Sequence, residues 1–182
     1  EEQVPRLSLR GTATPVIVHD LVIAGFDNGK VLASSLANGD TVWDTQVSAP
    51  KGRTELERLV DIDSAVKIAD DDVFVVGFQG RAAMLALDSG QIWWTRDVSS
   101  YRGVDIDDNA MYVAAADGQV LALQRRTGVE LWHQDMLKYR RLSAPVVVGE
   151  FVAVADFEGY MHWLDKTNGN LAARIGGIGG RV

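Results

Sequence analysis

Residues 118–132, GQVLALQRRTGVELW, contain a glycine, a second glycine ten residues later and a tryptophan four residues after that. The same spacing recurs along the chain. The first glycines are Gly29, Gly80, Gly118 and Gly159, and the second glycines are Gly39, Gly90, Gly128 and Gly169. Trp43, Trp94 and Trp132 complete three repeats, and Ala173 stands at this position in the fourth. Such self-similarity indicates a repeat architecture.

Each repeat predicts four short strands. In the first repeat the apolar residues Val22, Ile23 and Ala24 stand shortly before Gly29, and the other repeats match them. Three consecutive apolar positions predict a strand that is covered on both faces. Ile17 marks an earlier strand, and the polar residues between the two are typical of a hairpin turn.

Four antiparallel strands in a repeat of about 40 residues predict an all-β fold, a β-propeller. The predicted blades are approximately residues 12–48, 62–99, 101–137 and 142–176, with an inter-blade insertion at 49–61. Because a single blade cannot bury both of its faces, we expect the tryptophans to fill the space between blades. Four blades are few for a closed ring, so we expect about half of a larger propeller, whose uncovered faces favour self-association.

The composition argues against several classes of protein. A net charge of −7 and a pI near 4.9 disfavour binding to nucleic acid or to anionic lipid. The chain has no cysteine, which excludes disulfides and cysteine nucleophiles within it. Because the chain starts at Glu1 without a signal sequence, we expect any targeting or lipid-anchor sequence to lie outside it.

The segment GRTELERLVDID, residues 52–63, interrupts the repeat. The interval from Gly29 to Gly80 is 51 residues, whereas the later intervals between first glycines are 38 and 41. The extra residues fall between two blades. Blade-to-blade connections emerge on one rim of a propeller, and exposed loops on a rigid scaffold often carry binding groups.

Five residues form the candidate binding site on this rim. Arg10 and Asp61 both stand nineteen residues before the first glycine of their repeats, so they occupy matching places on adjacent blades. Asp63 should point to the same side as Asp61, with the residue between them turned inward. With Leu7 and Leu9 they make an apolar hot spot with a charged border. A merely solvated charged loop remains the alternative.

The repeat form resembles the PQQ-like, or quinoprotein-type, propeller repeat. The combination of LSLRG (7–11), TELERLVDID (54–63), LDSGQIWW (87–94) and EGYMHWLDKTNG (158–169) is similar to the BamB family, lipoproteins of the β-barrel assembly (BAM) complex. This resemblance implies the later half of an eight-bladed propeller and a non-enzymatic scaffold without a cofactor. It also implies a place on the periplasmic side of the outer membrane, held by an amino-terminal lipid anchor that this chain lacks.

The resemblance also implies partners. Members of the family bind the POTRA domains of BamA within the BAM complex, and contact with nascent outer-membrane proteins is left open. The family's two leucines and arginine of L-S-L-R are matched by Leu7, Leu9 and Arg10, and its D-x-D pair by Asp61 and Asp63.

The repeat is also found in proteins with two other functions. A PQQ-dependent dehydrogenase shares the repeat, but such enzymes use an adjacent cysteine pair that is missing here. Calcium would need six to eight oxygen ligands, and the aspartates near Asp71 and Asp107 fall at hairpin turns instead. A generic propeller adaptor that binds peptides is the second alternative. His19, His133 and His162 stand at unlike repeat positions, which gives no support to hydrolysis.

Overall fold

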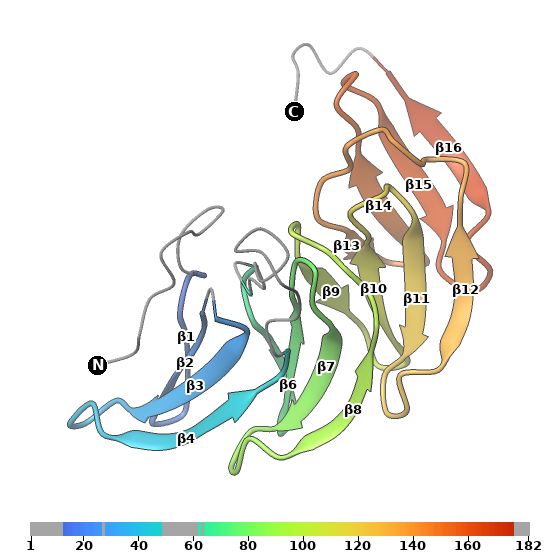
Figure 1. Ribbon diagram of the computed structural model, residues 1–182. Helices are drawn as coiled ribbons and strands as arrows, with labels where there is room; N and C mark the ends of the chain where they lie inside the picture. The colour runs from blue at the N-terminus through green and yellow to red at the C-terminus, as the bar shows by residue number, and fades with distance from the viewer. Residues whose placement is uncertain (1–12, 27, 49–61, 63, 177–182) are drawn as a thin grey trace. The chain divides into compact units, whose positions relative to one another are not determined.

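The computed structural model describes residues 13–26, 28–48, 62 and 64–176 (Figure 1). They form sixteen strands and no helix, arranged as four sheets of four antiparallel strands in chain order. Within these ranges, no helix is long and apolar enough to cross a membrane. The predicted all-β class with four-stranded blades is confirmed.

The four blades have similar strand lengths. Blade 1 contains β1 (Val16–Val18), β2 (Leu21–Gly25), β3 (Lys30–Ser35) and β4 (Thr41–Gln46). Blade 2 contains β5 (Lys67–Ala69), β6 (Asp72–Val76), β7 (Ala82–Ala86) and β8 (Ile92–Arg96). Blade 3 contains β9 (Val104–Ile106), β10 (Ala110–Ala114), β11 (Val120–Gln124) and β12 (Glu130–Gln134). Blade 4 contains β13 (Val146–Val148), β14 (Phe151–Ala155), β15 (Met161–Asp165) and β16 (Leu171–Ile175).

The middle strands of blades 2 and 3 are buried on both faces, whereas those of blades 1 and 4 are only partly buried. Every residue of β7 and β10 is buried. Both strands consist of apolar residues and tyrosine, whose side chains point alternately to the two faces, so neither face is polar. This is why the sequence shows runs of apolar residues where a half-exposed strand would show alternation.

The second glycine of each repeat closes the hairpin between the third and fourth strands. Gly39, for example, has a φ of 78° and donates its N–H to the Ser35 carbonyl at 2.9 Å. A residue in this left-handed conformation after a tight turn produces a β-bulge, and glycine adopts it without steric cost. Accordingly, the third and fourth strands of all four blades shift register at the same repeat position, Ala33/Ser34 in blade 1.

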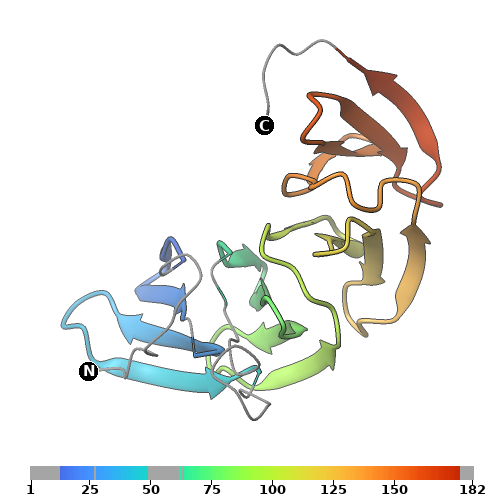
Figure 2. The ribbon, with the colours of Figure 1, turned by 45° about the horizontal axis from the view of Figure 1, so that its top comes forward.

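The chain divides into two compact units, residues 1–101 and 102–182. Unit 1 contains blades 1 and 2, whose buried side chains form one hydrophobic cluster that includes Ile23, Val73 and Leu85. Unit 2 contains blades 3 and 4, with a second cluster around Tyr112 and Leu164. Within each unit the two sheets lie side by side in both views (Figures 1 and 2).

A tryptophan joins the two blades of unit 1. Trp43 on β4 is only 7% exposed and donates its indole N–H to the Leu87 carbonyl of blade 2 at 2.9 Å. Its ring lies against Gly90, where an added Cβ would come within 2.5 Å of the ring. Two residues further along β4, the Thr45 hydroxyl donates to the Gly90 carbonyl at 2.8 Å.

The same contacts join the blades of unit 2. The indole N–H of Trp132 donates to the Lys166 carbonyl at 2.8 Å, and its ring lies against Gly169. Gln134 supplies the second hydrogen bond, to the Gly169 carbonyl at 2.8 Å. In each unit, therefore, the tryptophan of one blade sits on the second glycine of the next. Trp94 on β8 is also buried, at 7% exposure.

Candidate functional site

We call one end of each blade the glycine-turn rim, because it carries the turn between the second and third strands. The segments that link neighbouring blades lie at the same end. In unit 1, Ile62 lies on this rim and is fully buried. Its N–H donates to the Phe26 carbonyl at 3.2 Å, and its side chain fills the space beside Gly25. The link thus rests against the end of β2 in blade 1.

The link that follows blade 2 makes an equivalent contact. Ser100 donates its N–H to the Gly77 carbonyl at 3.1 Å. Ile62 and Ser100 each stand eighteen residues before the first glycine of the next repeat. Each donates its N–H to the carbonyl of the residue that stands three positions before the first glycine of the previous repeat. The two links therefore follow one pattern, although one is preceded by a long insertion.

The predicted binding residues lie outside the described residues. These are Leu7, Leu9, Arg10, Asp61 and Asp63, together with the insertion at 49–61. Ile62, which stands between the two aspartates, is turned inward as the alternation predicts.

In unit 2, Arg140 occupies the repeat position that corresponds to Arg10 and Asp61. Its guanidinium lies 2.9 Å from a carboxylate oxygen of Asp156 and 2.9 Å from one of Glu158. Asp156 is completely buried and also accepts hydrogen bonds from the amides of Glu158 and Tyr160, each at 3.0 Å. The Nε2 atom of His162 lies 2.8 Å from the same carboxylate.

These contacts around the buried carboxylate of Asp156 form a clamp on the glycine turn of blade 4. Burial by itself would raise the pKa of Asp156, but hydrogen bonds from His162, the Tyr160 amide and Arg140 outweigh it and hold the pKa below its ordinary value. A carboxylate and imidazole so fully enclosed are not open to a substrate. Sequence reasoning missed the cluster because the pattern of apolar residues marks neither the burial of Asp156 nor its contact with Arg140.

Asp156→Asn is expected to lower the free energy of unfolding of unit 2 by about 2 kcal/mol at neutral pH, because it removes a buried charge that three groups stabilise. Since the folded pKa is lowered, the stabilisation is present above the ordinary carboxyl pKa of about 3.9 and is lost as the pH falls through the folded pKa. Denaturant titrations from pH 7 to pH 3 measure this.

Glu158→Gln is the matched control, because its exposed carboxylate bonds the same arginine and should contribute about 0.5 kcal/mol or less. A difference between wild type and Asp156→Asn that stays constant down to pH 3 would contradict the assigned role.

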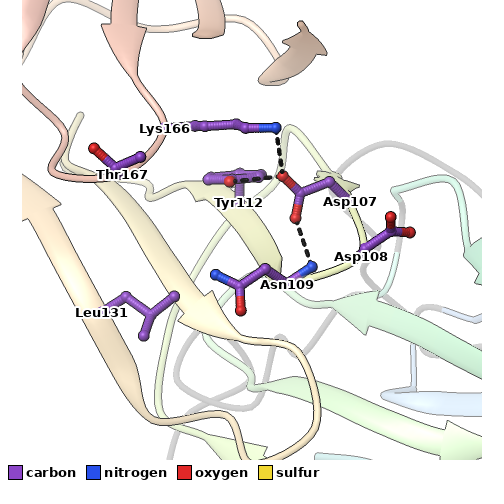
Figure 3. A pocket seen from close by; sticks show the side chains of 7 residues that line it. All are labelled: Asp107, Asp108, Asn109, Tyr112, Leu131, Lys166 and Thr167. Atoms are coloured by element: carbon purple, nitrogen blue, oxygen red, sulfur yellow. Dashed lines mark hydrogen bonds and ion pairs between the residues drawn. The ribbon is translucent and has the colours of Figure 1, made fainter. Parts of the chain in front are cut away.

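Aspartates at the opposite end of the blades serve local turns. Asp107 accepts hydrogen bonds from the Asn109 amide at 2.9 Å and from the Tyr112 hydroxyl at 3.0 Å (Figure 3). It also accepts one from the Ala110 amide at 2.8 Å. The described part of the chain contains no group of three or more His, Asp or Glu residues that could hold a metal ion.

Four-stranded blades joined by tryptophan–glycine contacts define the class of this protein as a propeller of PQQ-like repeats. The family model described as "Outer membrane protein assembly factor BamB" matches residues 1–134 and 104–176. The chain belongs to the BamB family.

Individual relatives agree with this assignment. The chain is 42% identical over 174 residues to BamB of Pseudomonas aeruginosa, which covers 96% of the chain and 46% of the relative. It is 46% identical over 167 residues to BamB of Aliivibrio fischeri, covering 92% and 43%. The chain spans about half the length of the curated relatives it matches.

Solved structures give the same fold. The crystal structure of BamB from Moraxella catarrhalis matches with a TM-score of 0.92 at 30% identity, covering 98% of this chain and 54% of that one. A europium-containing methanol dehydrogenase matches with a TM-score of 0.67 at 13% identity, covering 88% and 40%. At that identity the second match shows the shared propeller fold alone.

Proposed function

We propose that the protein carrying this chain is a non-enzymatic scaffold subunit of the outer-membrane β-barrel assembly machinery. It works on the periplasmic side of the outer membrane, held by a lipid anchor, and binds the POTRA domains of BamA. Membership of the BamB family supports this role, since the relatives are named as outer membrane protein assembly factors. Direct contact with nascent barrel proteins is compatible with the role and is not needed for it.

The contact surface in this proposal is formed by Leu7, Leu9, Arg10, Asp61 and Asp63. The observation that carries it is the placement of Ile62, which is buried against the end of β2. In an extended segment, inward packing of one residue directs its two neighbours to the other side. The neighbours of Ile62 are the two aspartates of the proposed surface.

The two kinds of side chain would have different tasks. Burying two leucines contributes roughly 3 to 6 kcal/mol before the cost of association. Exposed ion pairs contribute about 1 kcal/mol or less each. The leucines should therefore set the affinity, and the arginine and aspartates should set the orientation and the choice of partner.

Leu9→Ala is expected to weaken binding to the BamA POTRA domains about tenfold or more, and Asp63→Ala by less, because apolar burial outweighs an exposed charge pair. Titration calorimetry with purified POTRA domains measures both. Val42→Ala truncates an apolar side chain of β4 that is 49% exposed, and it should leave the affinity unchanged. A larger loss from Asp63→Ala than from Leu9→Ala would contradict this division of tasks.

A further inference from the structure

Unit 1 contains an acidic groove where blades 1 and 2 meet, at the end opposite the glycine-turn rim. The groove has a volume of about 550 Å³ and lies between the first hairpin turn of blade 1 and two hairpin turns of blade 2. The residues that determine its chemistry are Asp20, Asp71, Asp72, Asp88, Leu87 and Trp93. Trp93 is 54% exposed, although it is one of the largest apolar side chains in the chain. We call this cavity the acidic groove.

Unit 2 has a groove at the equivalent repeat position, with a volume of about 380 Å³ (Figure 3). Leu87 in unit 1 and Lys166 in unit 2 each stand three residues before the second glycine of their repeat. Their backbones also match: the Leu87 amide donates to the Asp71 carbonyl at 2.9 Å, and the Lys166 amide to the Glu150 carbonyl at 3.1 Å. Asp71 therefore corresponds to Glu150.

The chain supplies its own cation to the groove of unit 2. The Lys166 ammonium lies 3.4 Å from a carboxylate oxygen of Asp107 (Figure 3). It lies 3.9 Å from a carboxylate oxygen of Glu150. In unit 1 the carboxylate of Glu150 has a counterpart in Asp71, whereas Val18 stands at the repeat position of Asp107. The ammonium is replaced by the apolar side chain of Leu87.

Three carboxylates of the acidic groove, those of Asp20, Asp71 and Asp88, form no ion pair with the described part of the chain. The lining of the groove contains no lysine or arginine among the described residues. Like charges in one cavity repel each other, and a positive group placed among them would be attracted.

We infer that the acidic groove binds the arginine or lysine side chain of an extended polypeptide partner. The cation would take the place that Lys166 fills in unit 2, near Asp71 and Asp88. Its aliphatic stem would lie on Leu87, and the exposed indole of Trp93 offers a face for a cation–π contact. A metal ion fits less well, because the described carboxylates are not gathered around one point.

This inference is independent of the proposed POTRA contact. In antiparallel blades, the turn between the first two strands and the turn between the second and third strands lie at opposite ends. The acidic groove and the glycine-turn rim of unit 1 are therefore separate surfaces. One partner on each could be bound at the same time.

The test uses a fluorescein-labelled peptide, Gly-Ser-Arg-Gly-Arg-Ser-Gly, and fluorescence anisotropy with the intact chain at low salt. Leu87→Lys places a lysine in the acidic groove at the repeat position of Lys166, and it is expected to weaken binding about tenfold or more. The double variant Asp71→Asn with Asp88→Asn is expected to weaken binding by a similar factor. The same peptide with citrulline in place of arginine should not bind, because it has the shape of arginine without its charge.

Asp108→Asn is the matched control, since it neutralises a carboxylate in the groove that already contains Lys166. It should leave the affinity unchanged. Thermal unfolding of each variant confirms that it is folded. Lys166→Leu gives a second readout, because opening the groove of unit 2 should add a further binding site. No binding of the arginine peptide, equal binding to Leu87→Lys, or equal binding of the citrulline peptide would each overturn the inference.

Discussion

Trp132→Ala is expected to lower the free energy of unfolding of unit 2 by about 3 to 5 kcal/mol, the usual cost of removing a buried aromatic side chain. The indole is 8% exposed, contacts Tyr112 and bonds the Lys166 carbonyl. Truncation therefore leaves a cavity between two blades and a carbonyl without its donor. Equilibrium denaturation followed by circular dichroism measures the loss.

Trp93→Ala is the matched control, because it removes the same side chain from a site that is 54% exposed. Its cost should be about 1 kcal/mol or less. If the two substitutions destabilise the chain equally, tryptophan burial between blades is not what holds the blades together.

Gly90→Ala is expected to lower the free energy of unfolding of unit 1 by about 3 kcal/mol, because it combines backbone strain with overpacking. The residue has a φ of 68°, and an added Cβ would come within 2.5 Å of the Trp43 ring and 2.6 Å of the Thr45 hydroxyl. A methyl group there separates the two blades. Denaturant titration of the chain gives the change directly.

Gly39→Ala separates the two causes. Gly39 has the same conformation, with a φ of 78°, but an added Cβ would meet nothing within 4 Å. Only the backbone strain remains, so the expected cost is about 1 kcal/mol. Equal losses at Gly39 and Gly90 would mean that the contact with Trp43 contributes nothing.

The repeat made much of the fold predictable. Gly39 and its equivalents mark a hairpin that only a positive φ allows, and the apolar runs before Gly80 and Gly118 mark strands covered on both faces. The run before Gly29 marks a strand that is only partly buried. The bulge after Ala33 was not predicted, because register depends on how the turn is closed and leaves no mark in the pattern of apolar residues.

The site was predictable only in part. Alternation along the chain gave the inward position of Ile62, which is a local property. The contacts around Asp156 depend on how the link before blade 4 is bonded to that blade. The acidic groove, where Leu87 stands in place of a lysine, depends on which turns of blades 1 and 2 lie side by side. Such relations become visible only when equivalent positions of different blades are compared in space.

The most direct test of the account is the affinity of purified BamA POTRA domains for a variant in which Leu7, Leu9, Arg10, Asp61 and Asp63 are all alanine. Titration calorimetry should show a loss of about 100-fold or more, because the apolar centre and its charged border are removed together. A folded control with Asp71→Asn and Asp88→Asn in the acidic groove should bind as the wild type does. Unchanged affinity of the five-residue variant would contradict the account.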